Sequence, residues 1–311
     1  MSDQFGMGWV KDDKAVEDVK DFYRATYGRV AEFQRVYKAI AATDDNSDVV
    51  LWQAEKIVRG EILPSWNQGQ VGSCVGFGTT RAIQDLLYNE IATGQSEQYP
   101  GSDLCPEITY AGSRVEVGKG QLRGSDGSVG AWAADFVNRW GVVRRDKYQS
   151  VDLSRYNEAT TRRLGDAGVP DEIEAIAKLR PVSDIAQIKN TDELWVAIGA
   201  HKSVAVCSNQ GFTTVLERGM CRPSGEWGHC MCIRGRFTMP NGKRGFVIQN
   251  SWGGYLSGNR MLATKNSGEI ELPEGCFGAT EDVLANMVSQ GDTWAFAGLA
   301  GWKSDKLSWI P

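Results

Sequence analysis

Residues 67–77 constrain this chain more than any other stretch, and they read NQGQVGSCVGF. Gln68 lies six residues before Cys74, and a pattern typical of a helix follows the cysteine. A helix that begins at Cys74 would place the thiol at the positive end of the helix dipole, which lowers a thiol pKa. The side-chain amide of Gln68 can donate a hydrogen bond to a developing oxyanion. One segment therefore carries two of the groups that acyl transfer by a cysteine requires.

A cysteine nucleophile also needs a base and a group that orients the base. The chain has two histidines, His201 and His229. His229 opens an alternating stretch typical of a strand, and Asn241-Gly242 predicts a hairpin turn after it. The returning strand ends at Asn250, so a hairpin would bring Asn250 close to His229 and let it fix one imidazole tautomer. His201 precedes a predicted core strand, and we expect it to be structural.

Together these motifs resemble the papain-like cysteine peptidases. Three separated stretches carry the resemblance in the family's order, namely NQGxxGSC at Cys74, Gly228-His229, and NSWG from Asn250. The resemblance implies that Cys74 is the nucleophile, His229 the general base and acid, and Asn250 the orienting residue. It also implies an oxyanion hole formed by Gln68 and the backbone N–H of Cys74. The positions that it implies for substrate contact are Gly72, Ser73, Gly127, Ser128 and Trp252, and Trp252 would also shield the His229–Asn250 hydrogen bond.

The resemblance covers about residues 60 to 290. Residues 124–128 are similar to the family's glycine-rich wall, with Ser128 where a second glycine is common. Residues 7–10, residues 272–277 and Gly291-Asp292 are similar to a bacterial and phage branch. Val71 stands where secreted relatives carry a cysteine that forms a disulfide. The turn between His229 and Asn250 is longer than in papain. An added loop at the tip of a hairpin costs little free energy, so the fold tolerates it.

The resemblance implies an α+β fold with two lobes. A helical lobe would carry the nucleophile helix, and an antiparallel β lobe would carry the histidine and the asparagine. We expect a peptidase domain over residues 61–311, after an N-terminal helical extension over residues 1–60. Apolar spacing from Val16 to Ala42 predicts a long amphipathic helix in that extension. It fits a pro-region that blocks the cleft, an arm that docks a partner, or a helix packed on its own domain.

Composition limits the remaining possibilities. The net charge of −5 and the absence of a long apolar run argue against nucleic acid and membrane partners. The chain start lacks a basic stretch followed by an apolar core, so we expect a cytoplasmic protein, with a virion as the alternative location. The cysteines are odd in number and without paired spacing, which favours free thiols. Strand alternation sends Cys230 and Cys232 away from His229, so no metal or cofactor is expected.

The predicted function is hydrolysis of peptide bonds in a protein or peptide substrate. A Cys74 thiolate and a His229 imidazolium would act through a thioester acyl-enzyme. Two alternatives stay open. The same triad would serve an isopeptidase, amidase or transpeptidase. The fold would also serve as a structural or assembly component, for example of a phage particle, with latent or no proteolytic activity.

Overall fold

A computed structural model describes residues 5–27, 47–95 and 101–299 of the chain. Its helices are α1 (Asp13–Tyr27), α3 (Trp52–Arg59), α4 (Cys74–Ala92), α5 (Pro106–Gly112), α6 (Gly130–Arg139), α7 (Glu158–Ala167), α8 (Asp171–Ala177), α9 (Thr191–Gly199) and α10 (Glu281–Val288), with a π-helical turn, η2 (Ser113–Val117). Its strands are β1 (Val49–Val50), β2 (Val182–Gln187), β3 (Ser203–Phe212), β4 (Val215–Leu216), β5 (Pro223–Thr238), β6 (Arg244–Gln249), β7 (Ser257–Gly258), β8 (Met261–Thr264), β9 (Gly268–Glu271), β10 (Cys276–Thr280) and β11 (Asp292–Leu299).

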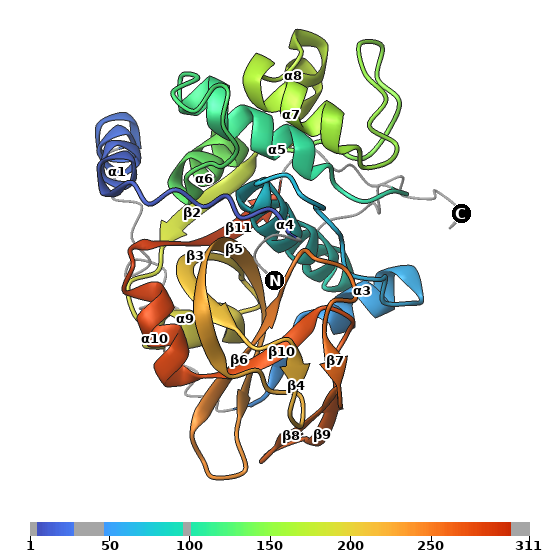
Figure 1. Cartoon of the computed structure of the whole chain (residues 1–311). Helices are drawn as coiled ribbons and strands as arrows, with labels where there is room; N and C mark the ends of the chain where they lie inside the picture. The colour runs from blue at the N-terminus through green and yellow to red at the C-terminus, as the bar shows by residue number, and fades with distance from the viewer. Residues whose placement is uncertain (1–4, 28–46, 96–100, 300–311) are drawn as a thin grey trace.

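The elements form two lobes, as the sequence predicted (Figure 1). Helices α4 to α8 make one lobe, and an antiparallel sheet in the order β10-β6-β5-β3-β11-β2 forms the framework of the other. The sheet carries β1 as an additional partner of β5. Residues 158–199 supply α7, α8, the edge strand β2 and α9.

Helix α4 lies between the lobes, and its residues from Cys74 to Glu90 are buried. A helix that is buried all round needs apolar or small residues on every face. Gly76 and Gly78 meet this need, because a Cβ at Gly76 would lie 2.7 Å from Pro106 O and one at Gly78 would lie 3.0 Å from the Cys230 backbone. The N-terminus of α4 is therefore pressed against both α5 and the middle of β5.

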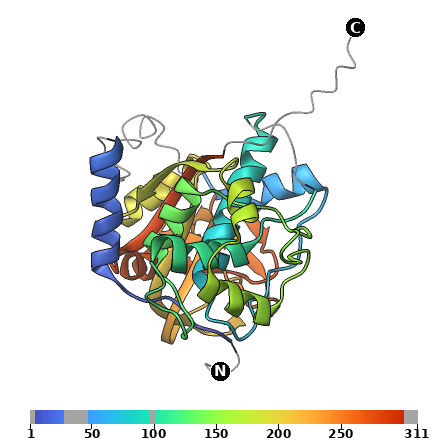
Figure 2. The ribbon, with the colours of Figure 1, turned by 90° about the horizontal axis from the view of Figure 1, so that it is seen from above.

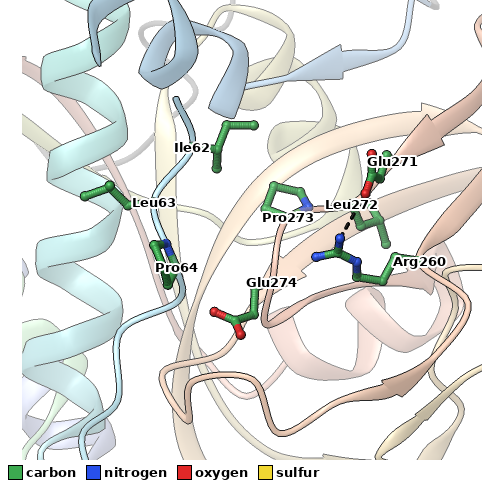
Figure 3. Close-up of a pocket in the computed structure, with 8 residues that line it drawn as sticks. All are labelled: Ile62, Leu63, Pro64, Arg260, Glu271, Leu272, Pro273 and Glu274. Atoms are coloured by element: carbon green, nitrogen blue, oxygen red, sulfur yellow. Dashed lines mark hydrogen bonds and ion pairs between the residues drawn. The ribbon is translucent and has the colours of Figure 1, made fainter. Parts of the chain in front are cut away.

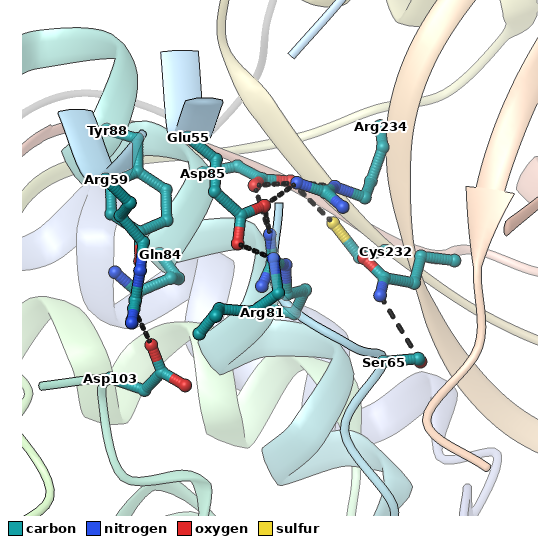
Figure 4. A network of polar contacts seen from close by, with 12 residues as sticks. Glu55, Arg59, Ser65, Arg81, Gln84, Asp85, Tyr88, Asp103, Cys232 and Arg234 are labelled. Carbon is teal, nitrogen blue, oxygen red and sulfur yellow. Dashed lines mark hydrogen bonds and ion pairs between the residues drawn. The ribbon is translucent and has the colours of Figure 1, made fainter. Parts of the chain in front are cut away.

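A buried ion network ties α3 to α4 and β5 (Figure 4). Glu55 of α3 accepts hydrogen bonds from Arg81 at 2.6 Å and from Arg234 at 2.8 Å. Asp85 accepts from both arginines, at 2.9 Å and 2.8 Å. Burial alone would raise the pKa of Glu55, but the two arginines lower it to about 2. Two carboxylates and two guanidinium groups thus neutralise each other where α3, α4 and β5 meet.

Helix α1 lies along the side of the molecule (Figure 2) and packs against α6. Its buried face carries Val16, Val19 and Tyr23, which recur at helical spacing. The Arg139 guanidinium of α6 lies 4.3 Å from the Phe22 ring centroid. The described part of the predicted helix therefore packs on its own chain, and the part beyond Tyr27 lies outside the described residues. No helix within the described ranges has the length and apolar character needed to cross a bilayer.

Candidate active site

Cys74 is the first residue of α4 and is fully buried. Its sulfur lies close to backbone N–H groups of Cys230, Gly8 and Val75, which favour the thiolate. Burial outweighs them and raises the pKa of Cys74 to about 12. The contact with Cys230 brings the sulfur to the residue that follows His229 on β5. In this state the thiol is protonated at neutral pH.

His229 and Asn250 are joined by a hydrogen bond between His Nε2 and Asn Oδ1 at 2.7 Å. The β5–β6 register places Cys232 opposite Gln249, which brings the two ends of the hairpin together as predicted. Because Asn250 Oδ1 can only accept, Nε2 carries the proton and Nδ1 presents a lone pair. Nδ1 is buried and has no hydrogen-bond partner. Burial lowers the pKa of His229 to about 4, against the opposing effect of Asn250.

Gln68 is held beside this pair by the loop that follows Asn250. Its backbone N–H donates to Ser251 O at 2.8 Å, and its side-chain Oε1 accepts from Ser251 Oγ at 2.5 Å. The side-chain amide Nε2 donates to Val71 O and to Gly6 O, each at 2.9 Å. Trp252 packs on the imidazole, with ring centroids 4.6 Å apart. Gln68 thus points its donor at a carbonyl group near the N-terminus of the chain.

That carbonyl belongs to Gly6. Gly6 is part of residues 5–10, which lie across the site and which we call the covering segment. The backbone N–H groups of Gly8 and Trp9 both donate to Gly228 O at 2.9 Å. On the other side, Ser128 N–H donates to Gly8 O at 2.7 Å, and Val10 N–H donates to Ser128 O at 2.9 Å. The segment therefore spans from the wall at Ser128 to the strand that carries His229, and it shields the site from solvent.

The covering segment fits only because two of its residues are glycines. A Cβ at Gly6 would lie 2.2 Å from Val71 O, and one at Gly8 would lie 1.9 Å from Gly72 O. Phe5 continues the contact by stacking on Trp252 at 4.8 Å and 9°. Gly8 also lies close to the Cys74 sulfur, so the segment covers the thiol.

Comparison with known proteins gives the fold. Xylellain, a cysteine protease from Xylella fastidiosa, superposes with a TM-score of 0.59 at 16% identity, covering 94% of this chain and 96% of that one. The fold is that of the papain-like cysteine peptidases. The proform of Amb a 11, a ragweed pollen cysteine protease, matches with a TM-score of 0.53 at 16% identity over 92% of this chain and 78% of that one.

Sequence relatives of this chain are plant cysteine proteases. Vignain of Ricinus communis is 26% identical over 220 residues, which are 67% of this chain and 54% of the relative. Germination-specific cysteine protease 1 of Arabidopsis thaliana is 24% identical over 264 residues, which are 78% and 61% of the two chains. The papain-like chain spans about half the length of the curated relatives it matches. No family model matches it.

The papain-like structure brings most of the expected substrate positions to the covering segment. Ser128 bonds the segment through its backbone, and a Cβ at Gly127 would lie 2.9 Å from Gly8 O. Gly72 lies against Gly8, and Trp252 lies under Phe5. Ser73 differs, because it is buried directly before α4, where its backbone N–H donates to Val71 O at 2.7 Å and its carbonyl oxygen accepts from Phe77 N–H at 3.1 Å. We therefore assign Ser73 to holding the start of α4. His201 is exposed and lies in the turn between α9 and β3.

The sequence motifs do not predict the covering segment. Residues 7–10 and Gly291-Asp292 stand out there only as family similarities, whereas in the structure a hydrogen bond from Trp9 Nε1 to Asp292 Oδ2 at 2.8 Å joins them. A usable signal was present in the alternation Phe5-Gly6-Met7-Gly8-Trp9, where each glycine lies between large residues. Such alternation suits an extended chain that presses one edge against another backbone.

Two hollows among the described residues lie away from the candidate catalytic residues. One of about 420 Å³ lies between residues 62–64 and the β8–β9 hairpin (Figure 3). Arg260 and Glu271 form an ion pair of 2.9 Å on its wall. Another, of about 520 Å³, lies at the turn between β5 and β6. Neither is lined by a candidate catalytic residue.

Proposed function

We propose that this chain is a cysteine peptidase whose site is covered by its own N-terminal segment. The observation that carries the proposal is the His229–Asn250 hydrogen bond of 2.7 Å, which leaves Nδ1 as a free lone pair in the site. Cys74 lies at the start of α4, and its sulfur lies close to the backbone N–H of Cys230, the residue that follows His229 on β5. A nucleophile, a base with a defined tautomer and the oxyanion donor Gln68 are the parts that amide hydrolysis requires.

In the proposed mechanism, departure of the covering segment admits water and substrate. His229 Nδ1 takes the thiol proton, which gives a thiolate–imidazolium pair. The sulfur attacks the scissile carbonyl carbon, and the oxygen accepts hydrogen bonds from Gln68 Nε2 and the backbone N–H of Cys74. His229 then donates its proton to the leaving amine, and a thioester is left on Cys74. Water, deprotonated by His229, attacks the thioester and releases the carboxylic acid.

The covering segment makes the proposed peptidase latent. It uses the donor of Gln68, stacks on Trp252 and buries Cys74, so a substrate must displace it. We assign residues 5–27 to this latency and α3 to the peptidase domain itself, because Glu55 of α3 neutralises buried arginines of α4 and β5. The domain boundary proposed here therefore falls before α3, instead of at residue 60.

We also propose a protein or peptide as the substrate and a reducing compartment such as the cytoplasm as the location. All seven cysteines are buried and free. A structural protein with the papain fold could also have a covered site. Packing of that fold alone, however, does not require Gln68, Cys74, His229 and Asn250 to lie together.

The test uses the full chain with Gly8→Ala, since the added Cβ cannot coexist with Gly72 O. It is compared with the double variant Gly8→Ala/Cys74→Ala on a fluorogenic peptide and on an unfolded protein. We expect hydrolysis by the first variant, lower by on the order of 10⁴-fold or more in the second. Equal rates would refute the role of Cys74, and no hydrolysis by either would favour the scaffold. Mass spectrometry of the products separates a peptidase from an isopeptidase or transpeptidase.

A further inference from the structure

Residues 68–73, which we call the oxyanion loop, carry the donor that we assign to the oxyanion and lead into the nucleophile. Gly69 has a φ of +60°, and Gly72 is a second glycine, so the backbone of the loop has wide conformational freedom. All seven cysteines lie within the described residues and are free, so no disulfide fixes the loop. Its position therefore depends on non-covalent contacts with the rest of the chain.

Part of that support comes from the covering segment. Gly6 N–H donates to Gly69 O at 3.0 Å, and Gly6 O accepts from Gln68 Nε2 at 2.9 Å. Both contacts break when the segment leaves, which is also when a substrate first needs the Gln68 donor. The proposed mechanism thus requires other contacts that hold the oxyanion loop in the open state.

The chain at the start of α7 supplies such contacts from the helical lobe (Figure 1). The hydroxyl group of Tyr156, two residues before α7, donates to Gln68 O at 2.7 Å. Glu158, the first residue of α7, accepts from Gln70 N–H at 3.2 Å. Between them, the side chain of Asn157 caps the helix and so fixes this turn. Two residues of the oxyanion loop are therefore bonded to one short, rigid turn.

The remainder of the oxyanion loop has separate partners. Gly72 N–H donates to Asp126 Oδ2 at 2.9 Å. Arg162 of α7 donates to Gln70 O at 3.3 Å and lies 3.7 Å from Asp126. These contacts hold the middle and the end of the loop. At Gln68 itself the helical lobe acts through Tyr156.

Tyr156 is in turn held on the nucleophile helix. Its ring packs edge-on against Phe77, with ring centroids 5.2 Å apart and an interplanar angle of 84°. Phe77 follows Cys74 by three residues on α4, so the two lie about one helical turn apart. The Tyr156 hydroxyl group also lies close to that of Ser73. Tyr156 thus joins Gln68 to the start of α4.

Gln68 is consequently held from both lobes. Ser251 of the β lobe accepts from Gln68 N–H and donates to its Oε1, whereas Tyr156 of the helical lobe donates to its backbone O. The bonds with Ser251 fix the Gln68 amide relative to His229. The bond from Tyr156 fixes it relative to Cys74, whose own N–H is the other donor of the proposed oxyanion hole.

We propose that Tyr156 is a positioning residue for the oxyanion hole and that Glu158 supports it. This inference rests on the proposed peptidase function. An oxyanion donor acts only when it points to the place where the charge develops, and loss of one donor lowers kcat by about 10²–10³-fold. Without the Tyr156 hydroxyl group both donors remain, but they are no longer fixed relative to each other. Substrate binding and formation of the thiolate do not require that alignment.

A purely structural role for Tyr156 predicts a different result. A tyrosine that only packs on Phe77 acts through its ring, and Tyr156→Phe keeps the ring. A general disturbance of the site would also slow every reaction of the Cys74 thiol. Alkylation by iodoacetamide is such a reaction, and it needs the thiolate but forms no oxyanion. Comparison of hydrolysis with alkylation therefore separates the two roles.

The experiment uses the full chain with Gly8→Ala, with and without Tyr156→Phe. Hydrolysis of a fluorogenic peptide amide is measured beside alkylation of the thiol by iodoacetamide, and the Cys74→Ala chain corrects for the other cysteines. We expect Tyr156→Phe to lower kcat by about tenfold or more, with KM and the alkylation rate changed by less than about twofold. Glu158→Ala should act in the same selective way by a smaller factor, and it decides alone if Tyr156→Phe fails to fold.

The matched control is Tyr148→Phe. The Tyr148 hydroxyl group also donates to a backbone carbonyl, that of Arg144 at 2.6 Å, but this carbonyl lies outside the oxyanion loop. The control should leave kcat and the alkylation rate unchanged. An unchanged kcat in Tyr156→Phe, or an equal fall in hydrolysis and alkylation, would overturn this inference and leave the peptidase intact. No Cys74-dependent hydrolysis by the Gly8→Ala chain would overturn both.

Discussion

Gln68 donates the hydrogen bond of its side-chain amide to the carbonyl oxygen of Gly6 at 2.9 Å. The donor that we assign to the oxyanion is therefore occupied by the chain's own backbone. An internal competitor of this kind acts at a high effective concentration, on the order of millimolar for a short tether. The latency that we propose therefore depends on how tightly the six residues of the covering segment fit, and single substitutions should change it.

Gly8→Ala should open the site. The new Cβ would lie 1.9 Å from Gly72 O, a backbone atom at the start of the nucleophile region that cannot move cheaply. We expect labelling of Cys74 by a peptidyl epoxide, followed by intact-mass measurement, to become at least about tenfold faster than in the parent chain.

The matched control for this variant is Lys11→Ala, which changes an exposed side chain just past the covering segment. It should label at the parent rate. Equal labelling rates for Gly8→Ala and the parent would show that the segment does not limit access to the thiol.

Acid should also open the site. In the covered state burial lowers the pKa of His229 from 6.5 to about 4, so protonation favours any state in which the imidazole meets water. The stability of the covered state is complete above about pH 6.5 and is lost as the pH falls through about 4, by at most about 3 kcal/mol. For Cys74 the pKa is raised from 9.0 to about 12, which favours the covered state until the pH exceeds about 9.

This dependence is measured as the rate at which 2,2′-dipyridyl disulfide labels Cys74 between pH 4 and 8. We expect the ratio of the parent rate to the Gly8→Ala rate to rise as the pH falls below 6.5. The Cys74→Ala chain corrects for the other cysteines. A ratio that stays constant across this range would contradict the link between imidazole protonation and release of the segment.

The proximity of His229 and Asn250 could be predicted because short motifs specify it. The turn at Asn241-Gly242 determined that β5 and β6 pair, and the register then brings Asn250 to His229. The position of the covering segment could not be predicted, because it depends on contacts over long sequence separations. The bond from Trp9 to Asp292 crosses 283 residues, and no local pattern specifies such a contact. The role of α3 was missed for the same reason, since Glu55 meets Arg234 only after the lobes pack.

Asn250→Ala should lower kcat in the Gly8→Ala background more than it changes KM. Its Oδ1 accepts from His229 Nε2 at 2.7 Å, and without it the imidazole can adopt the tautomer that presents N–H to the thiol. We expect a loss on the order of tenfold to a hundredfold, part of what acid–base catalysis contributes. Asn286→Ala, on the exposed face of α10, is the control. A rise in KM at constant kcat would instead assign Asn250 to substrate binding.

Glu55→Gln should destabilise the whole fold and leave the chemistry of the site untouched. The network of Glu55, Asp85, Arg81 and Arg234 is neutral and buried, and the variant leaves one excess positive charge in it. Removing one partner of a buried pair typically costs about 3–5 kcal/mol of unfolding free energy, and we expect that range here by urea denaturation. The pKa of Glu55 is about 2, below its usual value, so its contribution in the parent is complete above about pH 4.5 and is lost as the pH falls towards 2.

The matched control is Glu61→Gln, an exposed carboxylate just past α3, which should change stability by less than about 0.5 kcal/mol. A cost below about 1 kcal/mol for Glu55→Gln would mean that α3 is not part of the folded domain. In that event the domain boundary would return to residue 60. A full cost means that α3 stays with the peptidase even after residues 5–10 leave the site, because its carboxylate neutralises the arginines next to the nucleophile helix.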